Sequence, residues 1–134
     1  MFFLDTTYFV DLIRNSKMIK PITKKIGNEP LFTTTFNLFE AQMGSYSIKN
    51  EELRNKAIDK LNKTFDRIEI LPFLKGDALK AAEIAGILKR RGKIVGVDII
   101  TAAIALNNGC TVVTRNRNHF QWISEETGLE VVFY

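Results

Sequence analysis

Residues 96–114 read GVDIITAAIALNNGCTVVT and carry the strongest structural signal in the chain. After Asp98, residues 99–106 are apolar almost all round, which predicts a buried helix. The Asn-Asn-Gly at 107–109 ends that helix, and residues 111–114 then predict a short buried strand. A buried helix followed by a buried strand is typical of an α/β fold, in which helices cover a sheet.

The same alternation extends through the rest of the sequence. Apolar runs predict further strands at residues 2–4, 31–33, 68–71 and 131–133. Helical spacing predicts helices at residues 7–13, 18–26, 36–43, 50–65, 77–91 and 120–126, with a polar loop at 115–119. Strands alternating with helices predict a central, mostly parallel sheet of four or five strands, flanked by helices in a three-layer sandwich.

Length and composition exclude several classes of protein. With 134 residues, 46% of them apolar and 25% charged, residues 1–134 are expected to form a single domain that needs no disulfide to fold. No apolar run approaches the roughly 20 residues that span a bilayer, so no membrane partner is expected. The first residues lack the basic start of a secretory signal, and the single cysteine agrees with a cytoplasmic location.

Positive charge is concentrated in acid-free stretches, although the net charge is only +4. The first stretch, between Asp11 and Glu29, holds Arg14, Lys17, Lys20, Lys24 and Lys25. The second holds Lys89, Arg90, Arg91 and Lys93, and the third holds Arg115 and Arg117. These stretches indicate either a polyanionic partner such as a nucleic acid, or only a solvated basic surface.

Three acids interrupt patterns that apolar residues would otherwise fill. Asp5 ends the first predicted strand, Glu40 stands between Phe39 and Met43 on the predicted buried face of a helix, and Asp98 begins the apolar helix. Each has a simpler explanation. Asp5 and Asp98 suit helix N-caps, and Glu40 suits an internal pair with a Lys or Arg.

Acids at strand ends and helix starts can meet at one edge of a parallel sheet, where ligands bind. Like charges held so close repel each other unless a cation neutralises them, and carboxylate oxygens favour Mg²⁺ or Mn²⁺. Thr114, Arg115 and Asn116 should project over the same edge, although Asn116 also suits a turn. With one cysteine and one histidine a zinc site is not expected, and the lone His119 is predicted to be structural.

Several enzyme classes lack their motifs here: there is no Gly-rich phosphate loop, no Ser-centred nucleophile elbow and no Cys-x-x-Cys pair. Metal-assisted chemistry on a phosphate remains. Four segments support it: residues 3–13 read FLDTTYFVDLI, 33–44 read TTTFNLFEAQMG, 96–109 read GVDIITAAIALNNG, and 111–120 read TVVTRNRNHF. In this order and at these separations they resemble the PIN-domain family, particularly the small VapC-type toxin ribonucleases of toxin–antitoxin pairs.

The resemblance implies a PIN-like fold over nearly the whole length and a Mg²⁺- or Mn²⁺-dependent endoribonuclease, a hydrolase of phosphodiester bonds. It implies that Asp5, Asp98 and Glu40 hold the metal, that Asn116 completes the catalytic set, and that Thr6 and Thr114 support it. In the family a fourth acid often stands where this chain has Asn116, and the position of His119 is often acidic. Asn116 is therefore expected to orient water or substrate.

RNA is the implied substrate, with basic side chains as candidates for its backbone: Arg14, Lys17, Lys24, Lys25, Arg90, Arg91 and Arg115. The resemblance also implies a cognate antitoxin and a homodimer. Two alternatives stay open: a PIN-like RNA-processing nuclease without an antitoxin, and a catalytically silent module that binds RNA or protein.

Overall fold

The computed structural model describes residues 1–134 and is built on a single five-stranded sheet. All its neighbouring strands pair in parallel, in the order β3-β2-β1-β4-β5. The strands are β1 (Phe2–Leu4), β2 (Leu31–Thr34), β3 (Glu69–Leu71), β4 (Thr111–Thr114) and β5 (Val131–Phe133). The predicted α/β class is confirmed, and the sheet is parallel throughout.

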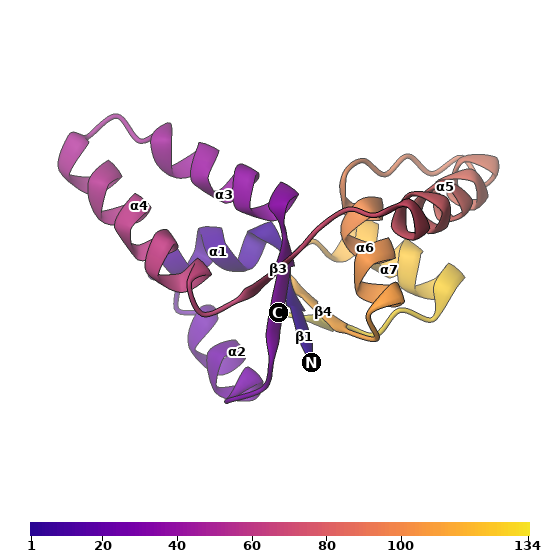
Figure 1. The fold of residues 1–134 in the computed structure, drawn as a ribbon, viewed down its shortest axis with the longest axis horizontal. Coiled ribbons are helices and arrows are strands. Elements are labelled where there is room, and N and C mark those ends of the chain that lie inside the picture. The colour runs from indigo at the N-terminus through magenta and orange to yellow at the C-terminus, as the bar shows by residue number, and fades with distance from the viewer.

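Helices cover the sheet on both faces (Figure 1). One face carries α1 (Thr6–Ile13), α2 (Ile19–Ile26), α3 (Thr35–Tyr46) and α4 (Glu51–Phe65). The other carries α5 (Lys75–Arg90), α6 (Asp98–Asn107) and α7 (Arg117–Thr127). None of these helices is both long enough and apolar enough to cross a membrane.

The two central strands explain why two cores form. Successive side chains of a strand point to opposite faces, so Phe3 and Val112 enter the core beneath α5–α7, while Leu4 and Val113 enter the core beneath α1–α4. All four are fully buried. β1 and β4 are thereby fixed side by side, and their carboxyl ends open at the same edge of the sheet.

Three helix boundaries differ by two or more residues from those the sequence predicts. α3 passes through Gly44 to Tyr46, since the buried Ser45 keeps that turn on the core and outweighs the cost of about 1 kcal/mol for a helical glycine. α5 begins at Lys75, where the Asp77 side chain accepts a hydrogen bond from the Leu74 N–H and so secures the first turn.

α7 begins at Arg117, so the polar loop predicted at 115–119 is wrong in its second half. Phe120 and Ile123 are both fully buried and lie three residues apart on one face of the helix. Their packing on the sheet draws the preceding residues into the first turn. His119 is therefore helical and has a fixed orientation.

Candidate functional site

Asp5 lies at the carboxyl end of the central strand β1 and is 3% exposed. Its Oδ2 accepts hydrogen bonds from the hydroxyls of Thr114 (2.7 Å) and Thr7 (3.2 Å), and its Oδ1 accepts one from Asn37 Nδ2 (3.4 Å). Asp5 occupies the N-cap position of α1, but its side chain makes no capping bond. The helix-cap explanation therefore does not account for this carboxylate.

The surroundings of Asp5 disfavour its charged form. Burial raises the pKa of Asp5, and the negative charge of Asp98 raises it further, while the hydrogen bonds from Thr114 and Thr7 act in the opposite direction. No Lys, Arg or His side chain forms an ion pair with Asp5. A buried carboxylate beside a second acid, with no cationic side chain on it, has the electrostatics of a cation site.

Glu40 faces the same edge from α3, but the predicted face of that helix is wrong. The buried side chains of α3 are Asn37, Ala41 and Ser45, whereas Phe39 is 62% exposed and Met43 is also exposed. Small side chains turn inward because α3 packs against both α1 and α4. Glu40 therefore lies at the border of the buried face and is half-buried.

Charge couples Glu40 to the other two acids. Burial raises the pKa of Glu40, and the charges of Asp5 and Asp98 raise it further; a hydrogen bond involving the Thr6 side chain opposes them. Glu40 has no Lys or Arg partner, so the predicted alternative of an internal ion pair is wrong. The structure brings the three acids close enough to repel one another.

Asp98 is the first residue of α6, and the N-cap of that helix is Val97. The Asp98 Oδ2 accepts a hydrogen bond from Asn116 Nδ2 (2.8 Å) and lies 2.7 Å from the Nδ1 of His119. Both donors come from the start of α7, where a spacing of three residues places them on one side of the helix. The N-cap explanation for Asp98 is therefore wrong.

The sequence predicts a structural loop residue at His119, but the structure places its ring against Asp98, an acid of the site. Its ring also packs against Trp122, with ring centroids 5.9 Å apart. Asn116 joins the two halves of the site, because its side chain binds Asp98 while its N–H donates to Thr114 Oγ1, 3.0 Å away. The spacing Asn116-x-x-His119 at a helix start is the sequence signal for this pair.

Asn37 is a buried hub that the sequence did not single out. Its Nδ2 donates to Thr6 Oγ1 (2.9 Å) as well as to Asp5. Its Oδ1 accepts from the hydroxyls of Thr34 (2.7 Å) and Thr101 (3.4 Å). One amide thus links β2 and α3 to α1 and α6, which fixes Asp5 relative to the helices that carry Glu40 and Asp98.

The donor chemistry of the edge fits Mg²⁺ or Mn²⁺. No group of three His, Cys, Asp or Glu side chains is placed so as to hold a metal ion. Mg²⁺, however, usually takes only one or two carboxylates and keeps several waters. Asp5 and Asp98 are two carboxylates at this edge with Glu40 beside them, and their role as metal ligands remains a prediction.

The basic candidates do not form one continuous patch. Arg115 adjoins the site and pairs with Asp11, and Arg14 lines a cavity of about 490 Å³ among α1, α3 and α4. Lys17, Lys24 and Lys25 are exposed on or beside α2. Arg90 and Arg91 end α5 on the other side of the sheet, where Arg91 pairs with Glu126 (2.6 Å) (Figure 1).

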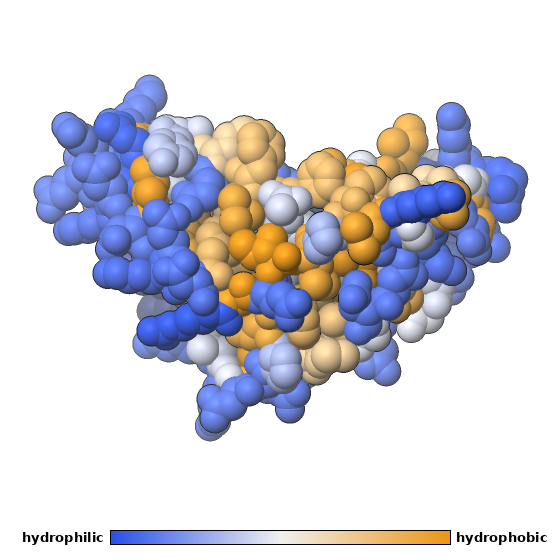
Figure 2. Space-filling model, in the orientation of Figure 1, coloured by the Kyte–Doolittle hydropathy of each residue, from blue (hydrophilic) through white to orange (hydrophobic).

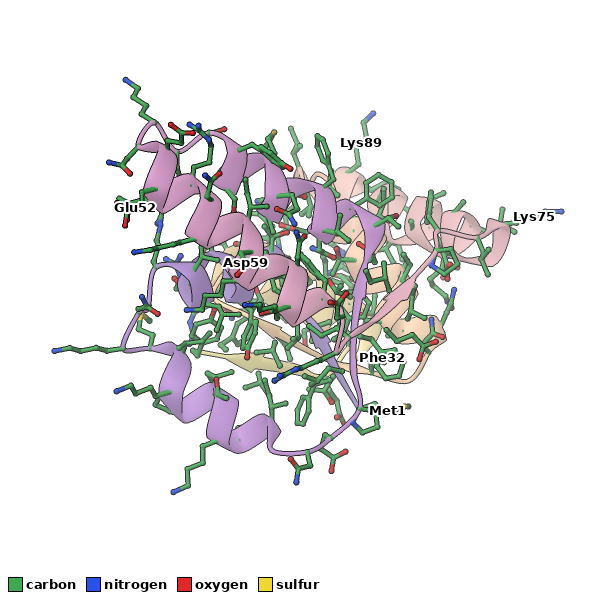
Figure 3. The ribbon with its side chains drawn as sticks, turned by 60° about the vertical axis from the view of Figure 1, so that its left-hand side comes forward. Met1, Phe32, Glu52, Asp59, Lys75 and Lys89 are labelled. Carbon is green, nitrogen blue, oxygen red and sulfur yellow. The ribbon has the colours of Figure 1, made fainter.

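On α4, Glu52 and Asp59 point into solvent (Figure 3).

Comparison with known proteins identifies the family. The family model named PIN domain matches residues 2–125. The chain belongs to the PIN domain family. The resemblance carried by its four segments is thereby confirmed.

Solved structures of low sequence identity share the PIN fold of this chain. VapBC2 from Rickettsia felis, bound to a DNA fragment from its promoter, has a TM-score of 0.82 at 23% identity, covering 99% of this chain and 98% of that one. FitAcB from Neisseria gonorrhoeae has a TM-score of 0.82 at 23% identity, with coverages of 100% and 97%. VapBC-5 from Mycobacterium tuberculosis has a TM-score of 0.78 at 22% identity, with coverages of 98% and 96%. No curated protein matches the chain significantly.

Proposed function

We propose that this PIN domain is a VapC-type toxin: an endoribonuclease that uses Mg²⁺ or Mn²⁺ to hydrolyse RNA phosphodiesters. One observation carries the proposal. Asp5, Glu40 and Asp98 come from three separate segments. Burial raises the pKa values of Asp5 and Glu40, the charge of Asp98 raises both further, and neither Asp5 nor Glu40 forms an ion pair with a Lys, Arg or His side chain. A stable protein tolerates such an arrangement at a functional site, where a bound cation restores the balance of charge.

Each side chain has a defined role in this proposal. Asp5 and Asp98 would hold the cation, and Glu40 would accept a proton or a hydrogen bond from the attacking water. Asn116 orients Asp98, while Thr114 and Thr6 fix Asp5 and the amide of Asn37. A bound divalent cation supplies a water of lowered pKa and stabilises charge on the phosphate. If water attacks the phosphorus in line with the 3′-oxygen, and that oxygen leaves with a proton, the products carry a 5′-phosphate and a 3′-hydroxyl.

An apolar surface beside the site supports a protein partner. Phe39, Met43 and Tyr46 project from α3, and Phe73 and Leu74 follow β3, all more than a third exposed. Figure 2 shows apolar side chains gathered over the middle of this face, between the hydrophilic outer surfaces of α4 and α5. Exposed apolar patches of this kind mark interaction sites. We assign this surface to a cognate antitoxin, in keeping with the toxin–antitoxin complexes among the structural neighbours, and the homodimer remains a separate prediction.

A silent binding module is the second candidate. The observation that favours it is the double contact on Asp98, where the Asn116 amide and the His119 ring both occupy the oxygen Oδ2. These contacts compete with a cation for that oxygen. A nuclease that processes RNA without an antitoxin would share the site of the toxin and lack only the partner.

Cleavage of a labelled single-stranded RNA tests the proposal. The wild type should cleave in Mg²⁺ or Mn²⁺ and stop in EDTA, and Asp98→Asn should abolish cleavage. Asp59→Asn is the matched control, because Asp59 lies on the exposed face of α4 and pairs only with Lys63. Undiminished cleavage by Asp98→Asn would refute the proposal, and metal-independent RNA binding without cleavage would establish the silent module.

A further inference from the structure

Arg115 stands in the sequence between two residues that bind acids of the site. Its neighbours on either side bind the two acids: Thr114 donates to Asp5, and Asn116 donates to Asp98. The Arg115 N–H itself donates to Thr7 Oγ1 (3.0 Å), which in turn bonds Asp5. The backbone of Arg115 is thus fixed to both carboxylates, and its side chain starts from the edge of the site.

A buried acid holds the Arg115 side chain in one direction. The Nε of Arg115 donates to Asp11 Oδ2 at 2.9 Å, and the hydroxyl of Tyr134 donates to the same oxygen at 2.8 Å. The Asp11 side chain is 6% exposed, whereas that of Arg115 is 41% exposed. Burial and the nearby Asp11 raise the pKa of Tyr134, so its hydroxyl keeps its proton and remains a donor.

The pairing leaves the functional end of Arg115 free. A guanidinium has five N–H donors, and only the one on Nε is used, so both Nη groups lack a protein partner. Such a planar fork suits bidentate binding to a phosphate. The nearby Arg117 is engaged differently, because its guanidinium lies over the ring of Phe133, 4.7 Å from the ring centroid.

We propose that Arg115 is a pre-organised clamp for the RNA phosphate next to the scissile bond, with Asp11 and Tyr134 as its positioning residues. The inference rests on the proposed nuclease function and adds a specific substrate contact to it. Asp11 lies one helical turn beyond Thr7 on α1, so the fork is held about 6 Å along the helix from the residue that bonds Asp5. Arg115 therefore pairs with Asp11 and with neither Asp5 nor Asp98.

A purely structural ion pair is the competing explanation, and the two make different predictions. If the pair only stabilises the fold, removing both charges together restores the stability and the RNA cleavage that are lost when one charge is removed. If Arg115 binds substrate, the double variant regains stability and stays defective toward RNA. Asp11→Asn/Arg115→Ala compared with Arg115→Ala therefore separates the two roles.

The test measures KM and kcat for cleavage of a labelled single-stranded RNA in Mg²⁺, and RNA affinity by fluorescence anisotropy in EDTA over a series of salt concentrations. Arg115→Ala should raise KM about tenfold while kcat changes less than threefold, and should reduce the salt slope of binding by about 0.7, the loss of one phosphate contact. Tyr134→Phe, which removes one hydrogen bond, should raise KM about twofold. Arg117→Ala is the control and should leave KM unchanged.

Two results would overturn the inference: a KM for Arg115→Ala within twofold of the wild-type value, or full recovery of KM in the double variant. A wild-type protein that neither binds nor cleaves RNA would instead refute the proposed function. Cleavage by the wild type, together with an unchanged KM for the Arg115→Ala variant, would refute only the clamp.

Discussion

Replacing Asp5 by Asn should stabilise the metal-free protein while abolishing cleavage. Burial and the charge of Asp98 hold the pKa of Asp5 above its ordinary value of 3.8. The folded state therefore binds this proton more tightly than the unfolded state does, so the contribution of Asp5 to stability decreases as pH rises through the interval between the two pKa values. Above that interval Asp5 is charged in the folded protein and lowers the free energy of unfolding by its full amount. Asp5→Asn removes this cost.

The magnitude follows from two opposing terms. An unpaired buried charge costs several kcal/mol, much of which the three hydrogen bonds to Asp5 already offset. Asn loses the charge-assisted strength of the Thr114 bond, about 1 kcal/mol. We expect a net gain of about 1 kcal/mol near neutral pH, which raises Tm by about 4 °C for a domain of this size.

Thermal unfolding followed by circular dichroism measures this difference. In EDTA at neutral pH, Asp5→Asn should unfold at a higher temperature than the wild type, and the gap should narrow as the pH approaches the ordinary carboxyl range. Mn²⁺ should then raise the Tm of the wild type and leave Asp5→Asn unchanged. Asp59→Asn, on the exposed face of α4, should behave as the wild type does in both conditions. A lower Tm for Asp5→Asn in EDTA would refute the proposed electrostatics of the site.

Three further predictions concern other residues. Asn37→Ala should lower the free energy of unfolding by about 2–3 kcal/mol, measured by urea denaturation, because Asp5, Thr6 and Thr34 lose a buried partner; a loss below about 0.5 kcal/mol would contradict its role as a hub. His119→Asp adds a fourth acid to Asp5, Glu40 and Asp98 and should tighten Mn²⁺ binding about tenfold, measured by calorimetry. Unchanged affinity would place His119 outside the metal site. Lys24→Gln together with Lys25→Gln should reduce the salt slope of RNA binding by about 1.4, and an unchanged slope would exclude α2 from the RNA surface.

The sequence predicts the strands and most helices of this fold because burial on both faces leaves plain apolar runs. Residues 99–106, for example, are apolar almost all round, and α6 is buried between α5 and α7. The face of α3 was missed because its large apolar side chains are exposed and its buried side chains are small or polar. Propensity and periodicity do not distinguish a buried apolar face from an exposed one.

The sequence predicts the acids of the site from their places at strand ends and helix starts, but it does not predict the residues that contact them. Asn37 reaches Asp5 across 32 residues, and Tyr134 reaches Asp11 across 123 residues. Such contacts depend on how helices pack across the sheet, which no local pattern records. His119 was missed for a related reason, since its role depends on the helical turn that Phe120 and Ile123 impose on it.

Anomalous scattering from crystals grown with Mn²⁺ would locate the cation directly. A peak within about 2.2 Å of carboxylate oxygens of both Asp5 and Asp98, and lost in Asp98→Asn crystals, is the predicted result. A Mn²⁺ peak elsewhere on the molecule, with none between these two side chains at millimolar metal, would contradict it.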